Sequence, residues 1–239
     1  MDPLFDEGSS IPPYVWLAAA AISISLFFWF RLTKRNWKLM VVYVGALVGG
    51  LLGAKLTFLA AEGWMYYNTP GWSEQLLRGK TVLGALLSGY LSVEIVKRIV
   101  GLHHPTGDFF ATVVPLALIV ARFGCLAQGC CLGVPQPESW HTLTDQSGVS
   151  RWPAVPAEII FNLICLVVLN TMRREKILPG QHFHLYLIAY GLFRFLHEFV
   201  RATPRLFGPV SGYHIAALLV ALLGLIGFLK RRPKASALA

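Results

Sequence analysis

Apolar runs separated by short polar segments dominate the chain, and seven of these runs have about the length of a membrane helix. A helix rises about 1.5 Å per residue, so roughly 20 apolar residues cross about 30 Å of hydrocarbon. We see no strand alternation, no soluble-domain segment and no internal repeat. We therefore predict an all-α membrane protein with one integral membrane domain over residues 1–239. Its seven helices are predicted at residues 13–30, 39–61, 82–96, 109–127, 157–172, 182–200 and 213–229.

The composition agrees with a membrane protein. Hydrophobic residues make up 55% of the 239 residues and charged residues 14%, which is too apolar for an ordinary soluble domain. The first apolar run lacks a basic leader and a small-residue cleavage site. We therefore interpret it as a membrane helix rather than as a removable signal peptide.

Basic residues gather in alternate loops, whereas acidic residues collect in the remaining loops and near the N-terminus. By the positive-inside rule, the basic loops face the cytoplasm, which places the N-terminus outside and the C-terminus inside. The formal net charge of +9 is then mainly a topology signal, with some attraction to anionic lipid, and not a nucleic-acid-binding surface. The basic loops lie near residues 31–38, 97–98, 173–176 and 230–234.

Charged residues inside two apolar runs are the strongest functional signal. Arg122 interrupts the run 109–127, and an arginine in hydrocarbon is costly enough to mark a function. At about 1.5 Å per residue, Arg122 lies roughly 20 Å above the cytoplasmic end of its helix. Arg194 reaches nearly the same height in its own helix, with Glu198 one turn later. Three further helices begin at the outer side near Tyr14, Gly84 and Glu158.

Two guanidinium groups at one depth suit a lipid phosphate, because each presents a fork of donors that matches phosphate oxygens. A purely structural alternative stays open, in which Arg122 pairs with Glu158 and Arg194 with Glu198 to hold the bundle together. We favour the phosphate site, since intramembrane charges mark functional sites by default. The residues predicted to bind the lipid phosphate and headgroup are Arg122, Arg194, Tyr14, Lys80, Gly84, Gln128, Glu158 and Tyr190.

Lys80 lies in a Gly79-Lys80-Thr81 run that superficially resembles a nucleotide phosphate loop. The preceding glycine spacing of such a loop is absent and the run faces outside, so we reject a nucleotide site. An ordinary interfacial lysine is the favoured interpretation, and a contact with a headgroup phosphate stays open.

The four cysteines fall into two groups. Cys165 lies in the middle of a helix and is interpreted as a small core hydrophobe. Cys125, Cys130 and Cys131 lie near the outer face, where a structural role or a disulfide is favoured. Zinc is less favoured, because the spacing lacks a second ligand pair. A nucleophilic thiol activated by Arg122 is the third alternative, with Cys130 and Cys131 as catalytic candidates.

Four motifs occur between about residue 12 and residue 230. The segment 190–201, YGLFRFLHEFVR, resembles the late signature of the bacterial prolipoprotein diacylglyceryl transferase family, in which motifs similar to all four occur in the same order. The arginine and glycines of segment 121–133 resemble its central signature. Residues 153–158 resemble the approach to the following helix, and Pro13-Tyr14 resembles the start of the first helix.

The resemblance implies a seven-helix bundle in the bacterial inner membrane with a site open to the outer leaflet. It implies transfer of the diacylglyceryl group of phosphatidylglycerol to the thiol of a lipobox cysteine in an exported protein, with release of glycerol phosphate. No metal or dissociable cofactor is implied. Arg122 and Arg194 correspond to headgroup-binding arginines of the family, and Glu198 to the carboxylate one turn beyond.

The chain also departs from the family pattern. Leu83 occupies the position of a histidine that family members usually carry as a candidate base, and leucine cannot move a proton. Cys125 and Cys130 replace an asparagine and an acidic residue. His197, beside Glu198, is the best placed replacement for the base, and both are catalytic candidates. The alternative is an interfacial histidine that faces lipid headgroups.

Two other classes of function remain as alternatives. The first is a non-enzymatic protein that binds or moves phospholipid and retained the phosphate site after losing the histidine. The second is a thiol-disulfide membrane oxidoreductase that uses Cys130 and Cys131, for which blocking the thiols, but not replacing the arginines, abolishes function.

Overall fold

The computed structural model describes residues 36–103 and 106–231, together with residues 19–20, 23, 26–27 and 30–31. The described part of the chain is mostly helical, with one very short hairpin. Its elements are α2 (Trp37–Ala61), η1 (Gly63–Tyr66), α3 (Trp72–Arg78), α4 (Val82–Ile99), α5 (Gly107–Ala127), β1 (Leu143–Thr144), β2 (Ser150–Arg151), α6 (Ala154–Arg174), α7 (His182–His197), η2 (Glu198–Val200) and α8 (Gly212–Lys230).

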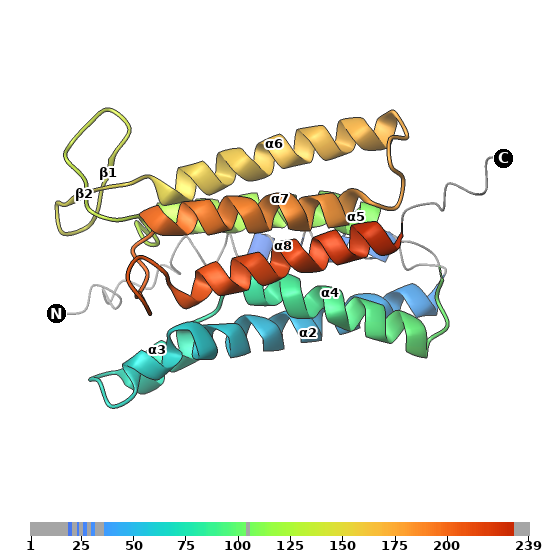
Figure 1. Cartoon of the computed structure of the whole chain (residues 1–239), viewed down its shortest axis with the longest axis horizontal. Helices are drawn as coiled ribbons and strands as arrows, with labels where there is room; N and C mark the ends of the chain where they lie inside the picture. Colours follow the sequence, from blue (N-terminus) through green and yellow to red (C-terminus); the bar gives the residue numbers. More distant parts are fainter. Residues whose placement is uncertain are drawn as a thin grey trace.

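The long helices lie side by side along one axis and form a bundle (Figure 1). The most extensive contacts join α2 to α4, α7 to α8, and α5 to α6. Glycines allow the close approach of α7 and α8: a Cβ atom at Gly191 would overlap the backbone of Ala217 and Ala221. Small residues at helix contacts are typical of membrane bundles, where close packing replaces the hydrophobic effect as the driving force.

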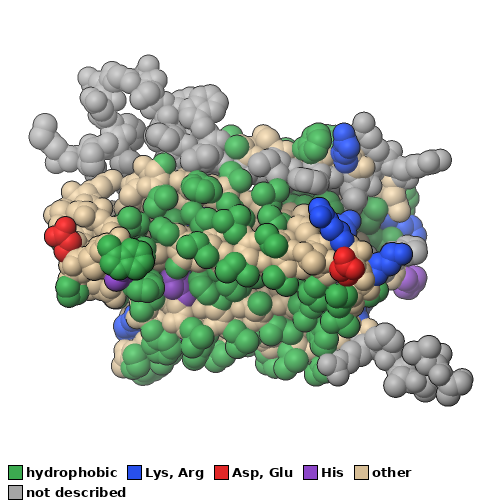
Figure 2. Space-filling model, turned by 90° about the horizontal axis from the view of Figure 1, so that it is seen from above, with side chains coloured by type: hydrophobic (Ala, Val, Ile, Leu, Met, Phe, Trp, Pro, Cys, Tyr) green, Lys and Arg blue, Asp and Glu red, His purple; other side chains and the backbone are tan. Residues whose placement is uncertain are grey.

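Four described helices, α2, α5, α6 and α8, are long and apolar enough to cross a membrane. The bundle exposes large apolar side chains along these helices, such as Leu51 at 65% and Val167 at 66%. Hydrophobic side chains cover the middle of the face in Figure 2, and charged side chains lie mainly toward the two ends. This distribution supports the predicted all-α membrane protein, with four spans identified by length and composition within the described residues.

The loop between α5 and α6 contains a hairpin that the sequence pattern did not predict. Strands β1 and β2 are antiparallel, and Asp145 closes the turn between them. Its Oδ1 atom accepts the backbone N–H groups of Ser147 and Val149 at 2.8 and 3.0 Å. Two-residue strands are too short to show a period of two, so the local signal for this hairpin is the turn chemistry of Asp145 and of Gly148, which has a positive φ.

The same loop is tied to the end of α7, and this brings Trp152 close to that helix. Gly133 donates its N–H to the Trp152 carbonyl at 2.9 Å, and Val134 donates to the Val200 carbonyl at 2.9 Å. A Cβ atom at Gly133 would overlap the Val200 carbonyl and the Trp152 side chain. Glycine is therefore required here because two backbone segments approach closely.

Candidate active site

Glu158, near the start of α6, is the centre of the most buried polar cluster. Its side chain is completely buried, and its Oε1 atom accepts hydrogen bonds from Arg122 Nη2 at 3.0 Å and from the Tyr190 hydroxyl at 2.7 Å. A buried carboxylate is stable only when it has such partners. The start of a helix also favours an anion, whereas the ends of α5 and α7 favour the cations Arg122 and Arg194.

Three arginines from different segments reach the second oxygen of this carboxylate. Arg122 Nη2 on α5 lies 3.0 Å from Glu158 Oε2. Arg194 Nη1 on α7 and Arg201 Nη1, directly after η2, each lie 3.9 Å from the same oxygen. The structure therefore brings the two arginines predicted from depth to one carboxylate, and adds Arg201 as a third. We call these three arginines with Glu158 and Glu198 the arginine cluster.

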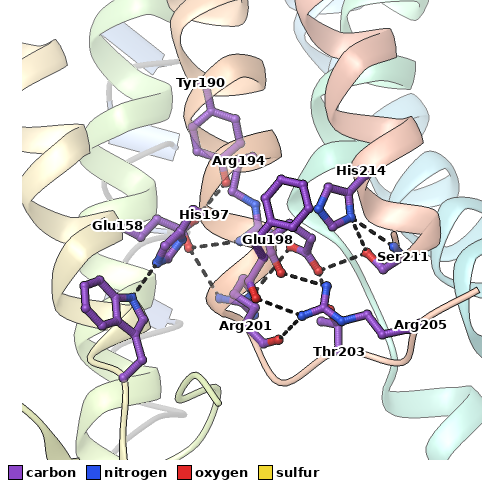
Figure 3. Close-up of polar contacts among 12 residues, drawn as sticks. Glu158, Tyr190, Arg194, His197, Glu198, Arg201, Thr203, Arg205, Ser211 and His214 are labelled. Carbon is purple, nitrogen blue, oxygen red and sulfur yellow. Dashed lines mark hydrogen bonds and ion pairs between the residues drawn. The ribbon is translucent and has the colours of Figure 1, made fainter. Parts of the chain in front are cut away.

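Glu198 is the second buried carboxylate of the arginine cluster (Figure 3). Its Oε2 atom lies 2.8 Å from Arg194 Nη2 and 3.7 Å from Arg201 Nε. Its Oε1 atom accepts hydrogen bonds from the hydroxyl groups of Thr203 and Ser211. Ser211 is the N-cap of α8, so this contact joins the start of α8 to the end of α7. The position of Glu198 is thus fixed from both helices.

The arginine cluster holds three positive charges and two negative charges. Burial raises the pKa of the Glu62 carboxyl, which follows α2, above its usual value. The pKa of Arg201 is lowered, first by burial and then by the nearby charge of Arg194. The nearby charge of Arg194 disfavours the charged form of Arg201, and three guanidinium groups against two carboxylates leave an excess of positive charge that an anion would relieve.

Several donors of the arginine cluster have no hydrogen-bond partner among the described residues. These buried atoms are Arg122 Nε, Arg194 Nε and Nη1, and Arg201 Nε and Nη1. Buried donors normally find partners, so such a group of exceptions needs an explanation. The predicted pairs of Arg122 with Glu158 and Arg194 with Glu198 both form. A purely structural lock would nevertheless require neither the third arginine nor the spare donors.

His197 is buried, with 6% of its surface exposed, so it does not lie on the outer surface of the bundle. Its ring stacks on Phe193 with centroids 4.9 Å apart, and its Nε2 atom accepts the indole N–H of Trp152 at 3.4 Å. An indole nitrogen can only donate, so the neutral ring carries its proton on Nδ1. Nδ1 is buried without a partner among the described residues. It is thus a free donor next to Glu198.

The structure places the other predicted binding residues differently. Tyr190 is buried and donates a hydrogen bond to Glu158. Gly84 lies at the contact of α4 with α2, where a Cβ atom would overlap Gly53 and Thr57, so helix packing accounts for this glycine. Lys80 is exposed before α4 and makes none of the contacts that build the arginine cluster. Gln128, half-buried at the end of α5, accepts a hydrogen bond from Gln146 through its carbonyl. Tyr14 lies outside the described residues.

The three cysteines near the end of α5 come together. No two of the sulfur atoms of Cys125, Cys130 and Cys131 are more than 4.8 Å apart, and we call them the thiol cluster. All three are free thiols, as is the buried Cys165, so the disulfide that was one part of the favoured interpretation does not form here, and a structural role for the three cysteines stays open. Arg122 Nη1 lies 3.6 Å from Cys125 Sγ, which makes the thiol cluster a neighbour of the arginine cluster.

An apolar cavity of 320 Å³ lies between α2, α4, α5 and α7. Nearly all of its lining is aliphatic or aromatic, which suits hydrocarbon rather than a polar ligand. Its lining includes Ala54, Leu86, Phe110, Val114 and Leu118.

Arg201, Trp152 and Ser211 were not predicted as site residues, because they lie in connecting segments outside the apolar runs. A signal for Arg201 was present: it follows Arg194 by seven residues and Glu198 by three, and so continues their helical face. For Trp152 and Ser211 the sequence offers no comparable periodicity, since the loop path alone brings them to α7.

A family model described as prolipoprotein diacylglyceryl transferase matches residues 4–230. Relatives named phosphatidylglycerol-prolipoprotein diacylglyceryl transferase include one from Clostridium tetani, 27% identical over 179 residues that cover 69% of this chain and 68% of the relative. One from Dehalococcoides mccartyi is 26% identical and covers 98% of this chain and 95% of the relative. One from Symbiobacterium thermophilum is 29% identical and covers 78% of this chain and 75% of the relative. Because the family match spans the apolar helices and the arginine cluster alike, the chain belongs to the prolipoprotein diacylglyceryl transferase family.

Proposed function

We propose that this protein transfers the diacylglyceryl group of phosphatidylglycerol to the cysteine thiol of an exported prolipoprotein. The names of its relatives and its family support this reaction. The observation that carries it in the structure is the arginine cluster, with its excess positive charge and its spare buried donors. A phosphodiester anion supplies the oxygen atoms that these donors lack.

The proposed chemistry uses this charge directly. The acceptor thiol loses its proton to water, and its sulfur forms a bond to the glyceryl carbon. The carbon–oxygen bond to the phosphate breaks with its electron pair on the phosphate oxygen, so glycerol phosphate leaves with one additional negative charge. Arg122, Arg194 and Arg201 stabilise that developing charge in a site shielded from water. Glu158 and Glu198 hold the three guanidinium groups in place before the lipid arrives, so that little reorganisation is needed during the reaction.

We also propose how the protein sits in the membrane. Seven spans, with the N-terminus outside and the C-terminus in the cytoplasm, place the arginine cluster at the outer leaflet of the bacterial cytoplasmic membrane. The alternating basic loops support this orientation. Helices α4 and α7 run alongside the four long apolar helices, which supports their inclusion as spans. Tyr14 would contact the headgroup from the first span, and the apolar cavity would take an acyl chain.

His197 is proposed to donate its Nδ1 proton in a hydrogen bond to the leaving phosphate oxygen, with Trp152 fixing the ring orientation. We expect His197→Ala to lower turnover by about 100-fold while leaving phosphatidylglycerol binding unchanged, since positioned proton donors contribute about that much. Release of glycerol phosphate measures turnover, and lipid retained on the purified protein measures binding. His103→Ala, at the opposite end of the bundle, is the control, and full turnover of His197→Ala would remove this role.

The reaction is tested with the purified protein, phosphatidylglycerol and a lipobox peptide that carries one cysteine. We expect release of glycerol phosphate and a peptide heavier by one diacylglyceryl group. Intact lipid and unmodified peptide would favour a non-enzymatic lipid-binding protein. Redox exchange that survives replacement of the arginines, but not blocking of the thiols, would favour the membrane oxidoreductase.

A further inference from the structure

The end of α5 turns back on itself and brings the thiol cluster together. Gly129 and Cys131 adopt positive φ values of 64° and 65°. The N–H of Cys130 donates to the carbonyl of Cys125 at 3.1 Å, which closes the turn. As a result, the sulfur atoms of Cys130 and Cys131 lie 3.3 Å apart, although adjacent side chains usually diverge. A left-handed conformation is unfavourable for cysteine and often marks a functional site.

The separation of these sulfur atoms is close to that of a metal site. Zinc–sulfur bonds of about 2.3 Å in a tetrahedron place the sulfurs roughly 3.8 Å apart. The three sulfurs here lie within 4.8 Å of one another, so side-chain rotations on the order of 1 Å would complete the geometry. Three protein ligands with one open position are typical of catalytic zinc sites, whereas structural sites use four ligands.

Charge favours the same assignment. Three thiolates and one Zn²⁺ carry a net charge of about −1, because each metal-bound thiol loses its proton. The Arg122 guanidinium, 3.6 Å from Cys125 Sγ, attracts that negative charge. Arg122 also binds Glu158 at 3.0 Å, so a metal held here would lie directly beside the arginine cluster. Cys131 is exposed, which leaves the fourth position open to a ligand from outside the bundle.

We propose that Cys125, Cys130 and Cys131 form a three-thiolate Zn²⁺ site whose fourth position takes the thiol of the acceptor cysteine. This role rests on the proposed transferase function. A metal site would also supply a way to activate the acceptor thiol that Leu83 cannot provide. Leu83, at the position of the usual candidate base, is a buried core residue with 1% exposure. The resemblance implied no metal, so the site would distinguish this chain from what the family pattern suggests.

The step balances without any redox partner. The acceptor thiol binds as a thiolate and its proton passes to water, because coordination lowers the pKa of a bound thiol. The bound sulfur then forms a bond to the glyceryl carbon while the carbon–oxygen bond breaks and its electron pair stays on the phosphate oxygen. The thioether product carries no charge and binds metal more weakly, so it can leave.

The first test measures metal binding. The full chain, reduced and purified in detergent, is titrated with Zn²⁺ and separately with Cd²⁺, whose thiolate complexes absorb in the ultraviolet. We expect one equivalent per chain with the charge-transfer band of three thiolates. Cys130→Ser and Cys131→Ser should lose the band, and Cys165→Ser, in the middle of α6, should keep it. No bound metal, or an intact mass lower by two hydrogens that reductant restores, would overturn the site.

The second test separates this proposal from the proposed function. Chelation or Cys130→Ser should abolish transfer to the lipobox peptide but leave phosphatidylglycerol binding intact, and Zn²⁺ should restore only the chelated wild type. Full transfer by metal-free protein would overturn the acceptor role while the transferase function stands. If the metal-loaded wild type transfers nothing, both the proposed function and the acceptor role of the metal are wrong. The metal titration then decides whether the three thiols bind Zn²⁺ at all.

Discussion

Arg194→Gln is expected to abolish measurable transfer and to weaken phosphatidylglycerol binding. Arg194 lies between the two carboxylates, 2.8 Å from Glu198 and 3.9 Å from Glu158, and keeps buried donors without partners. Removing one donor from a preorganised anion site costs about 100- to 1,000-fold in rate, and removing a charged donor belongs at the upper end of this range. Release of glycerol phosphate from phosphatidylglycerol is the measurement.

Arg98→Gln is the matched control for that substitution. Arg98 is exposed in the last turn of α4, at the end of the bundle that lies away from the arginine cluster. The same loss of one positive charge therefore leaves the arginine cluster unchanged. Transfer should stay at the wild-type rate in this variant. Equal losses in both variants would show that net charge, rather than the arginine cluster, controls activity.

Glu158→Gln should destabilise the protein by about 3–5 kcal/mol, because it leaves buried guanidinium groups without their shared carboxylate. Glu158 is completely buried and contacts Arg122, Arg194 and Arg201. Thermal or denaturant unfolding in detergent measures the change in the free energy of unfolding. We expect transfer to be lost as well, since the three arginines lose the group that orients them.

A second substitution tests the origin of that loss. If unbalanced charge is the cause, Arg122→Gln added to Glu158→Gln should recover part of the lost free energy of unfolding, because contacting groups are coupled. Glu138→Gln, on the exposed loop before the hairpin, should change neither stability nor transfer. A double variant that is less stable than the sum of the two single losses would contradict the account of Glu158 as a charge partner.

The apolar runs predicted much of the bundle because long continuous apolar segments have few other ways to satisfy their backbone in a membrane. The run 39–61 corresponds to α2, Trp37–Ala61, and the run 109–127 to α5, Gly107–Ala127. The hairpin was missed because its pairing depends on the turn at Asp145, not on periodicity. The first run, 13–30, lies mostly outside the described residues.

The part of the candidate site that lies on helices was predictable, because depth along a helix follows from residue position. Arg122, Arg194 and Glu198 lie on helices, so a rise per residue was enough to place them near one level. Gly84 was assigned to the lipid on the same reasoning, but depth cannot tell a lipid-facing glycine from one at a helix contact. Arg201 and Trp152 lie in loops, whose paths depend on tertiary contacts that no local pattern encodes.

The thiol cluster shows the same limit at a smaller scale. The spacing of Cys125, Cys130 and Cys131 offers no second ligand pair, so zinc was less favoured than a structural role or a disulfide. Cys131 has a positive φ and its sulfur lies 3.3 Å from that of Cys130, and a left-handed cysteine is not signalled by residue type. The proximity of the three sulfur atoms is therefore visible in the folded structure but was not predictable from the spacing of the cysteines.

A structure of the protein with bound phosphatidylglycerol would show directly whether the arginine cluster holds the lipid phosphate. We expect one lipid phosphate within hydrogen-bonding distance of Arg122, Arg194 and Arg201, on the donors that now lack partners. A phosphate bound instead beside Lys97 and Arg231 at the other end of the bundle, with the arginine cluster unchanged, would contradict it.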